Sequence, residues 1–171
     1  MIICKKCKSD VVYDGTLCPV CKTPLVIDDA DIRRAKAELD AARLDTKNPD
    51  RFFSLCNLLA DGGDTDGQRE FAKLLEKQDP INNLDRAMDY YKLAADVSDP
   101  YSTYRYSCLV GRIDARASSF FLRYSAILGC KEAYPAVSEH YSTLGNEELA
   151  AYYCYLAAEC DDTVSTVNMA K

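Results

Sequence analysis

Apolar residues recur every three or four positions along most of this chain after residue 28, the spacing of one face of an α-helix. The first such face, within residues 31–44, consists of Ile32, Ala35, Leu39 and Ala42. Pro49 predicts the start of a second helix, because proline fits the first helical turn. The pair Gly62-Gly63 predicts its end. The pattern therefore predicts a mainly helical protein.

A β-prone run precedes these helices. Residues 11–13, Val-Val-Tyr, predict a short strand, and Asp14-Gly15 is a hairpin-turn signal. We expect this turn to lead the chain back towards Cys18, so the amino-terminal segment is predicted to be a small β structure.

The helical part of the chain repeats itself. Residues 87–96, 118–127 and 150–159 align without gaps, and their first residues lie 31 and 32 positions apart. Each copy has a small residue first, an aromatic residue fourth and small residues at the eighth and ninth positions. The residues between the copies keep the same register, which gives two helices per period. A period of this length is typical of a solenoid, whose units bury their apolar faces only by stacking.

These copies resemble Sel-one-like repeats, which are relatives of the tetratricopeptide repeat. The family's second-helix pattern is matched by Ala87, Tyr90, Tyr91, Ala94, Ala95 and Asp96, and again by Ala150, Tyr153, Ala157, Ala158 and Glu159. The resemblance covers roughly residues 64–160. It implies an α-solenoid of antiparallel helix pairs with a groove that binds a protein or peptide.

Four cysteines define a metal site near the start of the chain. They form two Cys-x-x-Cys pairs, Cys4 with Cys7 and Cys18 with Cys21. Each pair lets two thiolates converge from one tight turn, and together they match a tetrahedral zinc site. Four thiolates leave no position for a reactive water, so we expect one structural zinc ion in a zinc ribbon.

The same segment offers an alternative function. The side chains that could contact RNA or DNA are Lys5, Lys6, Lys8 and Lys22. Asp10, Asp14 and the negative charge of a zinc ion bound by four thiolates offset these lysines. A nucleic-acid-associated adaptor is therefore the second hypothesis.

Charge and hydropathy narrow the classes of partner. The net charge is -6, and since residues 1–27 contribute four lysines against two aspartates, the rest of the chain carries -8. Such a body repels phosphate backbones and favours basic or apolar partners. The sequence contains no apolar stretch of membrane-spanning length and no secretory signal pattern. We expect a cytoplasmic protein that does not contact a membrane.

The expected fold class is thus mainly α, an α-solenoid of tetratricopeptide or Sel-one-like type with a small amino-terminal β zinc ribbon. The predicted domains are a zinc ribbon in residues 1–27, a connecting helix in 28–48, and a helical-repeat domain in 49–171, clearest over about 82–160.

None of the other candidate metal-binding or catalytic patterns in the sequence is complete. The aspartate-rich run 61–67 resembles a calcium loop but has Lys73 where a bidentate glutamate is needed, so it predicts a turn with a helix cap. His140 is the only histidine in the sequence, and we expect it to be a half-exposed helix residue without a catalytic role. Five further cysteines are expected to be reduced thiols: Cys56, Cys108, Cys130, Cys154 and Cys160. An enzyme is the least supported class.

The leading hypothesis is a non-catalytic protein-interaction module or adaptor. Tyr101, Tyr104 and Tyr134 lie on the first helices of their pairs, which face the groove in the families that the chain resembles. They are the candidates for partner contact. An open end of the stack would expose apolar surface, so a homodimer is a further expectation.

Overall fold

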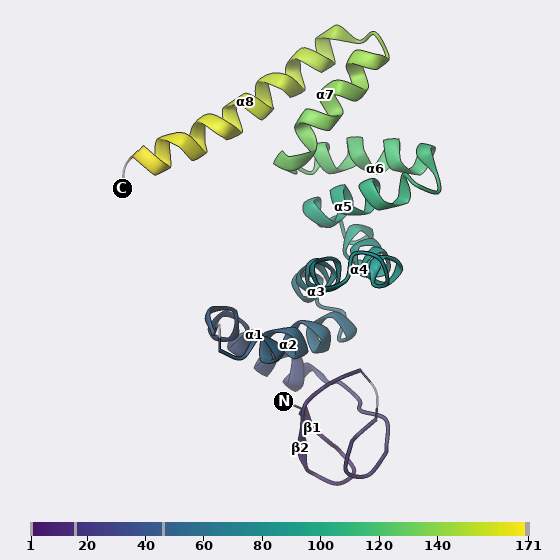
Figure 1. Ribbon diagram of the computed structural model, residues 1–171, viewed down its shortest axis with the longest axis vertical. Helices are drawn as coiled ribbons and strands as arrows, with labels where there is room; N and C mark the ends of the chain where they lie inside the picture. Colours follow the sequence, from purple (N-terminus) through teal and green to yellow (C-terminus); the bar gives the residue numbers. More distant parts are fainter. Residues whose placement is uncertain (1, 16, 46, 170–171) are drawn as a thin grey trace. The chain divides into compact units, whose positions relative to one another are not determined.

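The computed structural model describes residues 2–15, 17–45 and 47–169, with side chains through Cys160. The chain forms two compact units, Met1–Ala94 and Ala95–Lys171. Figure 1 shows their elements in chain order, with the strands in purple and the last helix in yellow. The expected fold class is confirmed, because the described chain is a series of antiparallel helix pairs preceded by a small two-stranded sheet.

The first unit begins with the sheet. Strand β1 (Ile2–Ile3) pairs antiparallel with β2 (Asp10–Val11), and Ile2 lies opposite Val11. The strand expected at residues 11–13 is therefore displaced towards the amino terminus, and the hairpin expected at Gly15 does not join the paired strands. The loop of the first cysteine pair joins them instead. A bridge between Leu17 and Pro24 closes the loop of the second pair.

Four helices follow. Their bounds are α1 (Asp29–Leu44), α2 (Pro49–Asp61), α3 (Thr65–Gln78) and α4 (Leu84–Asp96), whose last two residues belong to the second unit. Helix α2 packs against α1 and α3. Phe71 of α3 is fully buried, and its ring meets those of Phe53 and Tyr90 edge to face. These apolar contacts form the core of the first unit.

Helices α2 and α3 approach each other closely at Gly67. A Cβ atom at this position would lie 2.3 Å from the Cβ of Leu59. Because that separation is far inside van der Waals contact, only glycine allows this approach. The glycine is buried, so the sequence DTDG is part of the helix packing as well as of a turn.

Aspartate side chains start several helices, as expected for residues that accept hydrogen bonds from the unpaired first amides of a helix. Asp28 and Asp31 form a reciprocal capping box at α1, which begins at Asp29. Asp64 accepts from the amide of Gly67 at α3. The helix cap expected in residues 61–67 is therefore Asp64.

The second unit contains the remaining helices. Their bounds are α5 (Pro100–Val110), α6 (Ala115–Ile127), a 3-10 turn η1 (Lys131–Ala133), α7 (Tyr134–Thr143) and α8 (Glu147–Met169). Sequential helices pack pairwise. Ala126 of α6 packs in one buried cluster with Cys130, Ala133 and Val137. Among the described residues, no helix combines the length and hydropathy needed to cross a membrane.

The three sequence copies correspond to α4, α6 and the first half of α8, but they are not equally buried. Ala94 and Ala95 are buried in the first copy, and Ser125 and Ala126 in the second. In the third copy the matching pair, Ala157-Ala158, is half-buried and exposed respectively. The repeat pattern marks positions that can pack, and α8 leaves part of its packing face uncovered.

Candidate metal centre

The two cysteine pairs fold into matching loops. In the first, the Cys4 amide donates to the Ser9 carbonyl over 3.0 Å, and the Lys8 amide donates to the Cys4 carbonyl over 2.8 Å. In the second, Cys18 and Thr23 form the same bond at 2.9 Å, and Lys22 donates to Cys18 at 2.8 Å. Each loop thus turns its two thiols to one side.

The residue after each second cysteine has an unusual backbone conformation. Lys8 has a φ of 60° and Lys22 a φ of 56°. This left-handed region is uncommon for residues other than glycine, asparagine and aspartate. Its occurrence at the same position of both loops indicates that the loop hydrogen bonds impose it.

The four sulfur atoms converge. All four Sγ atoms lie within 4.8 Å of one another, with 3.5 Å between those of Cys4 and Cys21 and 3.6 Å between those of Cys7 and Cys18. Four sulfurs around a tetrahedral zinc ion with bonds of about 2.3 Å are separated by about 3.8 Å. The donor set and the spacing therefore fit a zinc ion, and the four predicted ligands are brought together.

Hydroxyl groups lie beside two of these sulfurs. Ser9 Oγ lies 3.4 Å from Cys7 Sγ, and Thr23 Oγ1 lies 3.3 Å from Cys21 Sγ. Hydrogen bonding by the Ser9 side chain lowers the pKa of Cys7, and that by Thr23 lowers the pKa of Cys21 to about 6. These two residues were not singled out from the sequence, although the matched triplets Cys-Lys-Ser and Cys-Lys-Thr were a usable signal.

The lysines of this segment are exposed, but one of them is engaged within the first unit. Lys5 forms an ion pair with Asp28 at the start of α1, with 3.0 Å between Nζ and Oδ2. Lys6, Lys8 and Lys22 are exposed around the cysteine loops. The ion pair ties the first cysteine loop to α1 and reduces the positive charge that is available to a phosphate backbone.

A second tie runs from the loop between the cysteine pairs to the helices. The hydroxyl of Tyr13 donates to Oδ2 of Asp61, the last residue of α2, over 2.9 Å. Tyr90 of α4 donates to the other oxygen of the same carboxylate. Burial, and then the Asp61 carboxylate, raise the pKa of both tyrosines. No sequence pattern predicted this contact, because Tyr13 and Asp61 are far apart along the chain.

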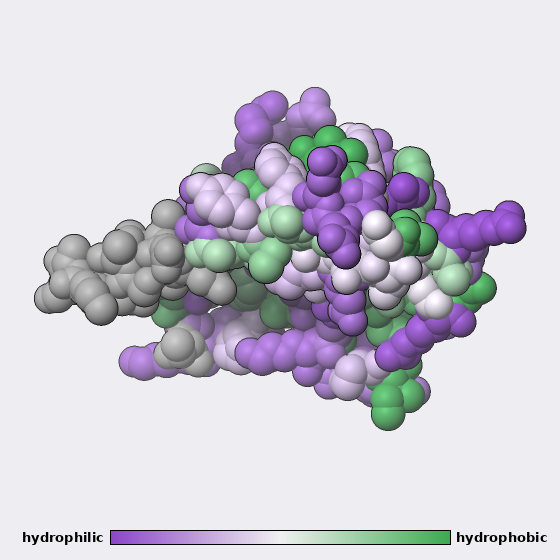
Figure 2. Space-filling model, turned by 90° about the horizontal axis from the view of Figure 1, so that it is seen from above, coloured by the Kyte–Doolittle hydropathy of each residue, from purple (hydrophilic) through white to green (hydrophobic). Residues whose placement is uncertain are grey.

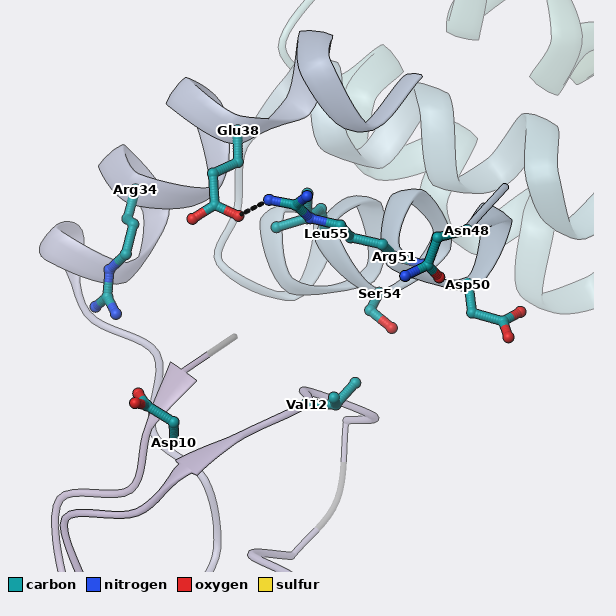
Figure 3. Close-up of a pocket in the computed structure, with 9 residues that line it drawn as sticks. All are labelled: Asp10, Val12, Arg34, Glu38, Asn48, Asp50, Arg51, Ser54 and Leu55. Atoms are coloured by element: carbon teal, nitrogen blue, oxygen red, sulfur yellow. Dashed lines mark hydrogen bonds and ion pairs between the residues drawn. The ribbon is translucent and has the colours of Figure 1, made fainter. Parts of the chain in front are cut away.

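A pocket of about 570 Å³ opens beside β2, between this strand and helices α1 and α2. In Figure 3 Asp10 and Arg34 lie on one side of it and Asp50 on the other. Arg51 donates to Glu38 over 2.8 Å between them, and this guanidinium lowers the pKa of the glutamate. The pocket therefore presents both signs of charge, with donors and acceptors that suit a polar ligand or a peptide backbone.

The other candidate residues from the sequence lie far from the four cysteines along the chain. Tyr104 and Tyr134 pack against the buried cluster of α6 and α7, so their rings contribute to the core of the second unit and not only to a surface. Tyr101 is half-buried, as is His140, which was expected to be a half-exposed helix residue.

Among the described residues, the five further cysteines form no disulfide. Cys56 and Cys130 are buried, and burial raises the pKa of each to about 12. Both are therefore neutral thiols that pack as small apolar side chains. Cys108 and Cys154 are exposed.

Comparison with known proteins identifies the fold. The chain is similar to the crystal structure of a protective antigen from uropathogenic Escherichia coli that displays an SLR fold, with a TM-score of 0.60 and 21% identity over 76% of this chain and 30% of that one. It is also similar to a Sel1 repeat protein from Oxalobacter formigenes, with a TM-score of 0.57 and 16% identity over 75% of this chain and 55% of that one.

The chain thus corresponds to about half or less of these neighbours. No protein-family model and no curated protein matches its sequence. At these identities the likeness establishes a shared helical-repeat fold of the Sel1 type.

Proposed function

We propose that this chain is a non-catalytic protein-interaction module, in which a helical-repeat array binds a protein or peptide and a single zinc ion holds the amino-terminal segment in a ribbon fold. The repeat architecture carries the proposal. Stacked helix pairs expose a long surface relative to their core, and such surfaces commonly serve binding. The likeness to Sel1-type structures supports it.

The zinc ion has a structural role in this proposal. Its ligands would be Cys4, Cys7, Cys18 and Cys21, which supply a closed set of four thiolates with no position for a substrate. A segment of under thirty residues buries little apolar surface, so metal binding would supply most of its folding free energy. We propose residues 1–27 as the ribbon, 28–48 as the connecting helix and 49–171 as the repeat domain, in a cytoplasmic protein.

The metal part is tested by metal analysis of the purified chain and by cobalt substitution. We expect one zinc ion per chain, and a cobalt form with the absorption of a tetrahedral four-thiolate site. The variant Cys18→Ser, Cys21→Ser should bind neither metal. Cys108→Ser, which removes an exposed thiol elsewhere, is the matched control and should bind both.

The binding part is tested by affinity capture from an extract of the source cell, followed by mass spectrometry. The intact chain, the Cys18→Ser, Cys21→Ser variant and the Cys108→Ser control are each used with and without nuclease. We expect a protein that all three retain after nuclease treatment. Capture that disappears with nuclease and with the doubly substituted variant would instead favour the nucleic-acid adaptor, acting through Lys6, Lys8 and Lys22. Recovery of no specific protein or nucleic acid by the intact chain would count against both functions.

A further inference from the structure

One face of α8 is exposed and carries both acidic and aromatic side chains. Glu148, Tyr152, Tyr155 and Glu159 recur at intervals of four, three and four residues, which places them on one side of the helix. Tyr152 is 55% exposed and Tyr155 59% exposed. The hydroxyl of Tyr155 donates to the carboxylate of Glu159. We call these four residues the α8 stripe.

The α8 stripe is not part of the repeat framework. In the same register α4 carries Asp85, Asp89, Lys92 and Asp96, and α6 carries Arg116, Phe120, Arg123 and Ile127. The small and aromatic packing positions recur between copies, whereas these outer positions change in charge and polarity. Stacking of the repeats therefore does not explain an acid, two tyrosines and an acid on α8.

A second feature lies beside the stripe on the helix surface. The adjacent positions are occupied by Ala151, Cys154 and Ala158, all of them exposed. Small residues allow the backbone of another helix to approach closely. On α6 the residue equivalent to Ala158 is Ala126, which packs against Ala133 and Val137 of η1 and α7. The corresponding position on α6 is thus covered by a helix.

The sequence around the α8 stripe carries charges of one sign only. Between Lys131 and Lys171 the sequence contains no lysine or arginine. The acidic residues in this interval are Glu132, Glu139, Glu147, Glu148, Glu159, Asp161 and Asp162. Figure 2 colours one face of the molecule by hydropathy, and hydrophilic residues are interspersed there with apolar ones.

We infer that this face of α8 binds a basic amphipathic helix of a partner protein. Lysine or arginine side chains of that helix would pair with Glu148 and Glu159 and lie over the rings of Tyr152 and Tyr155, which attract cations through their π faces. Its apolar side would cover Ala151, Cys154 and Ala158. A second copy of this chain is a poor occupant, because two such faces would bring like charges together. This inference specifies the partner class of the proposed interaction function and rests on it.

The test uses the full chain and two synthetic peptides. The first is an 18-residue amphipathic helix with leucine and alanine on one side and lysine on the other, and the second replaces every lysine with glutamate. Binding is measured by fluorescence anisotropy at low and high salt. We expect the lysine peptide to bind the chain and its affinity to fall as the salt concentration rises. The glutamate peptide should not bind.

Variants locate the contact. The double substitution Tyr152→Ala, Tyr155→Ala should weaken binding of the lysine peptide by about tenfold or more, as for exposed aromatic anchors. Tyr152→Phe, Tyr155→Phe should retain most of the affinity, since the ring faces remain. Glu148→Gln, Glu159→Gln should weaken binding several-fold and reduce its salt dependence. Asp85→Asn, Asp89→Asn removes two acidic charges from exposed positions of α4 and should leave the affinity unchanged.

Three results would overturn the inference: equal binding of both peptides, equal loss in the α4 and α8 charge variants, or self-association that Tyr152→Ala, Tyr155→Ala abolishes in sedimentation experiments. Affinity capture of the natural partner distinguishes failure of this inference from failure of the proposed interaction function. If affinity capture with Tyr152→Ala, Tyr155→Ala still retains the partner of the intact chain, the module binds protein through another surface. If the intact chain captures no protein, the proposed function itself fails.

Discussion

The two compact units differ in what holds their terminal segments. In the first, the amino-terminal segment is tied to the helices by polar groups far apart in sequence, through Tyr13 with Asp61 and Lys5 with Asp28. In the second, sequential helices pack through residues close in the repeat, such as Ala126 with Val137, and α8 keeps an exposed face. Hydrogen bonds, ion pairs and the convergence of four thiols depend on single atoms, whereas the packing of repeats is spread over many side chains. The two units should therefore respond differently to substitution.

Loss of the proposed zinc ion should have the largest effect on folding, and only in the first unit. Structural zinc contributes apparent binding free energies of about 10–16 kcal/mol in small domains. Cys18→Ser, Cys21→Ser should therefore unfold residues 2–27 while the amides of α5–α7 keep their protection from hydrogen exchange. Exchange monitored by NMR or mass spectrometry measures both regions at once. The Cys108→Ser control should resemble the unsubstituted chain, and loss of protection in α6 and α7 after metal removal would contradict separate stabilities.

Core truncations test whether the units unfold separately. Phe71 and Val137 are fully buried, one in each unit. Phe71→Ala should cost about 3–5 kcal/mol, and Val137→Ala less, about 2 kcal/mol, because fewer carbon atoms leave a smaller cavity. We expect each substitution to lower one of two transitions in urea, followed by circular dichroism and by exchange of assigned amides. One common transition that shifts with either substitution would show that the units are coupled.

Removal of the hydrogen bonds to Asp61 should have an intermediate effect on the stability of the first unit. Tyr13→Phe and Tyr90→Phe each remove one hydrogen bond to a carboxylate and should destabilise the first unit by about 1.5 kcal/mol. Asp61→Ala should make the two tyrosine substitutions nearly neutral, since their shared acceptor is then gone. Urea unfolding of the single and double variants completes this cycle. Full additivity of Tyr13→Phe and Asp61→Ala would mean that the hydrogen bond contributes nothing.

The same tie predicts a pH dependence. Because burial and Asp61 raise the pKa of Tyr13 in the folded chain, its contribution is complete below the ordinary tyrosine pKa of about 10 and declines as pH rises through the folded value. The difference in unfolding free energy between the unsubstituted chain and Tyr13→Phe should thus be constant from pH 7 to 9 and shrink at higher pH.

Substitution of the aspartates that cap helices should change the free energy of unfolding least. Asp114 accepts from the amides of Arg116 and Ala117 at the start of α6, and Asp114→Ala should cost about 1 kcal/mol. Asp64→Ala should cost somewhat more, because Asp64 caps α3 and also pairs with Lys36, whose pKa it raises. Midpoints of urea unfolding compare the two, and a larger loss for Asp114→Ala would contradict this order.

The parts predictable from sequence are those set by local chemistry. Cysteine spacing identified the four thiols that converge, and small residues at fixed positions identified the helices that stack. Aspartate caps and Pro49 set helix starts near the expected residues. The fold class followed from these features, because each depends on neighbours within one or two helical turns.

The rest depends on contacts between distant residues. The pairing of Ile2 with Val11 involves strands of two residues, too short to give a periodic signal. The Asp61 carboxylate looked like part of a turn, and only the fold brings Tyr13 and Tyr90 to it. The repeat pattern could not tell Ala158 from Ala126, because it records the capacity to pack and not the presence of a covering helix.

The lack of lysine and arginine between Lys131 and Lys171 has a practical consequence for mapping any complex. Amine-reactive cross-linkers have no lysine to react with anywhere in α7 or α8, and trypsin has no cleavage site inside that interval. A cross-linking experiment based on lysine would therefore miss a partner on α8 even at full occupancy. Carboxylate-directed coupling, with cleavage at tyrosine or glutamate, would report on it.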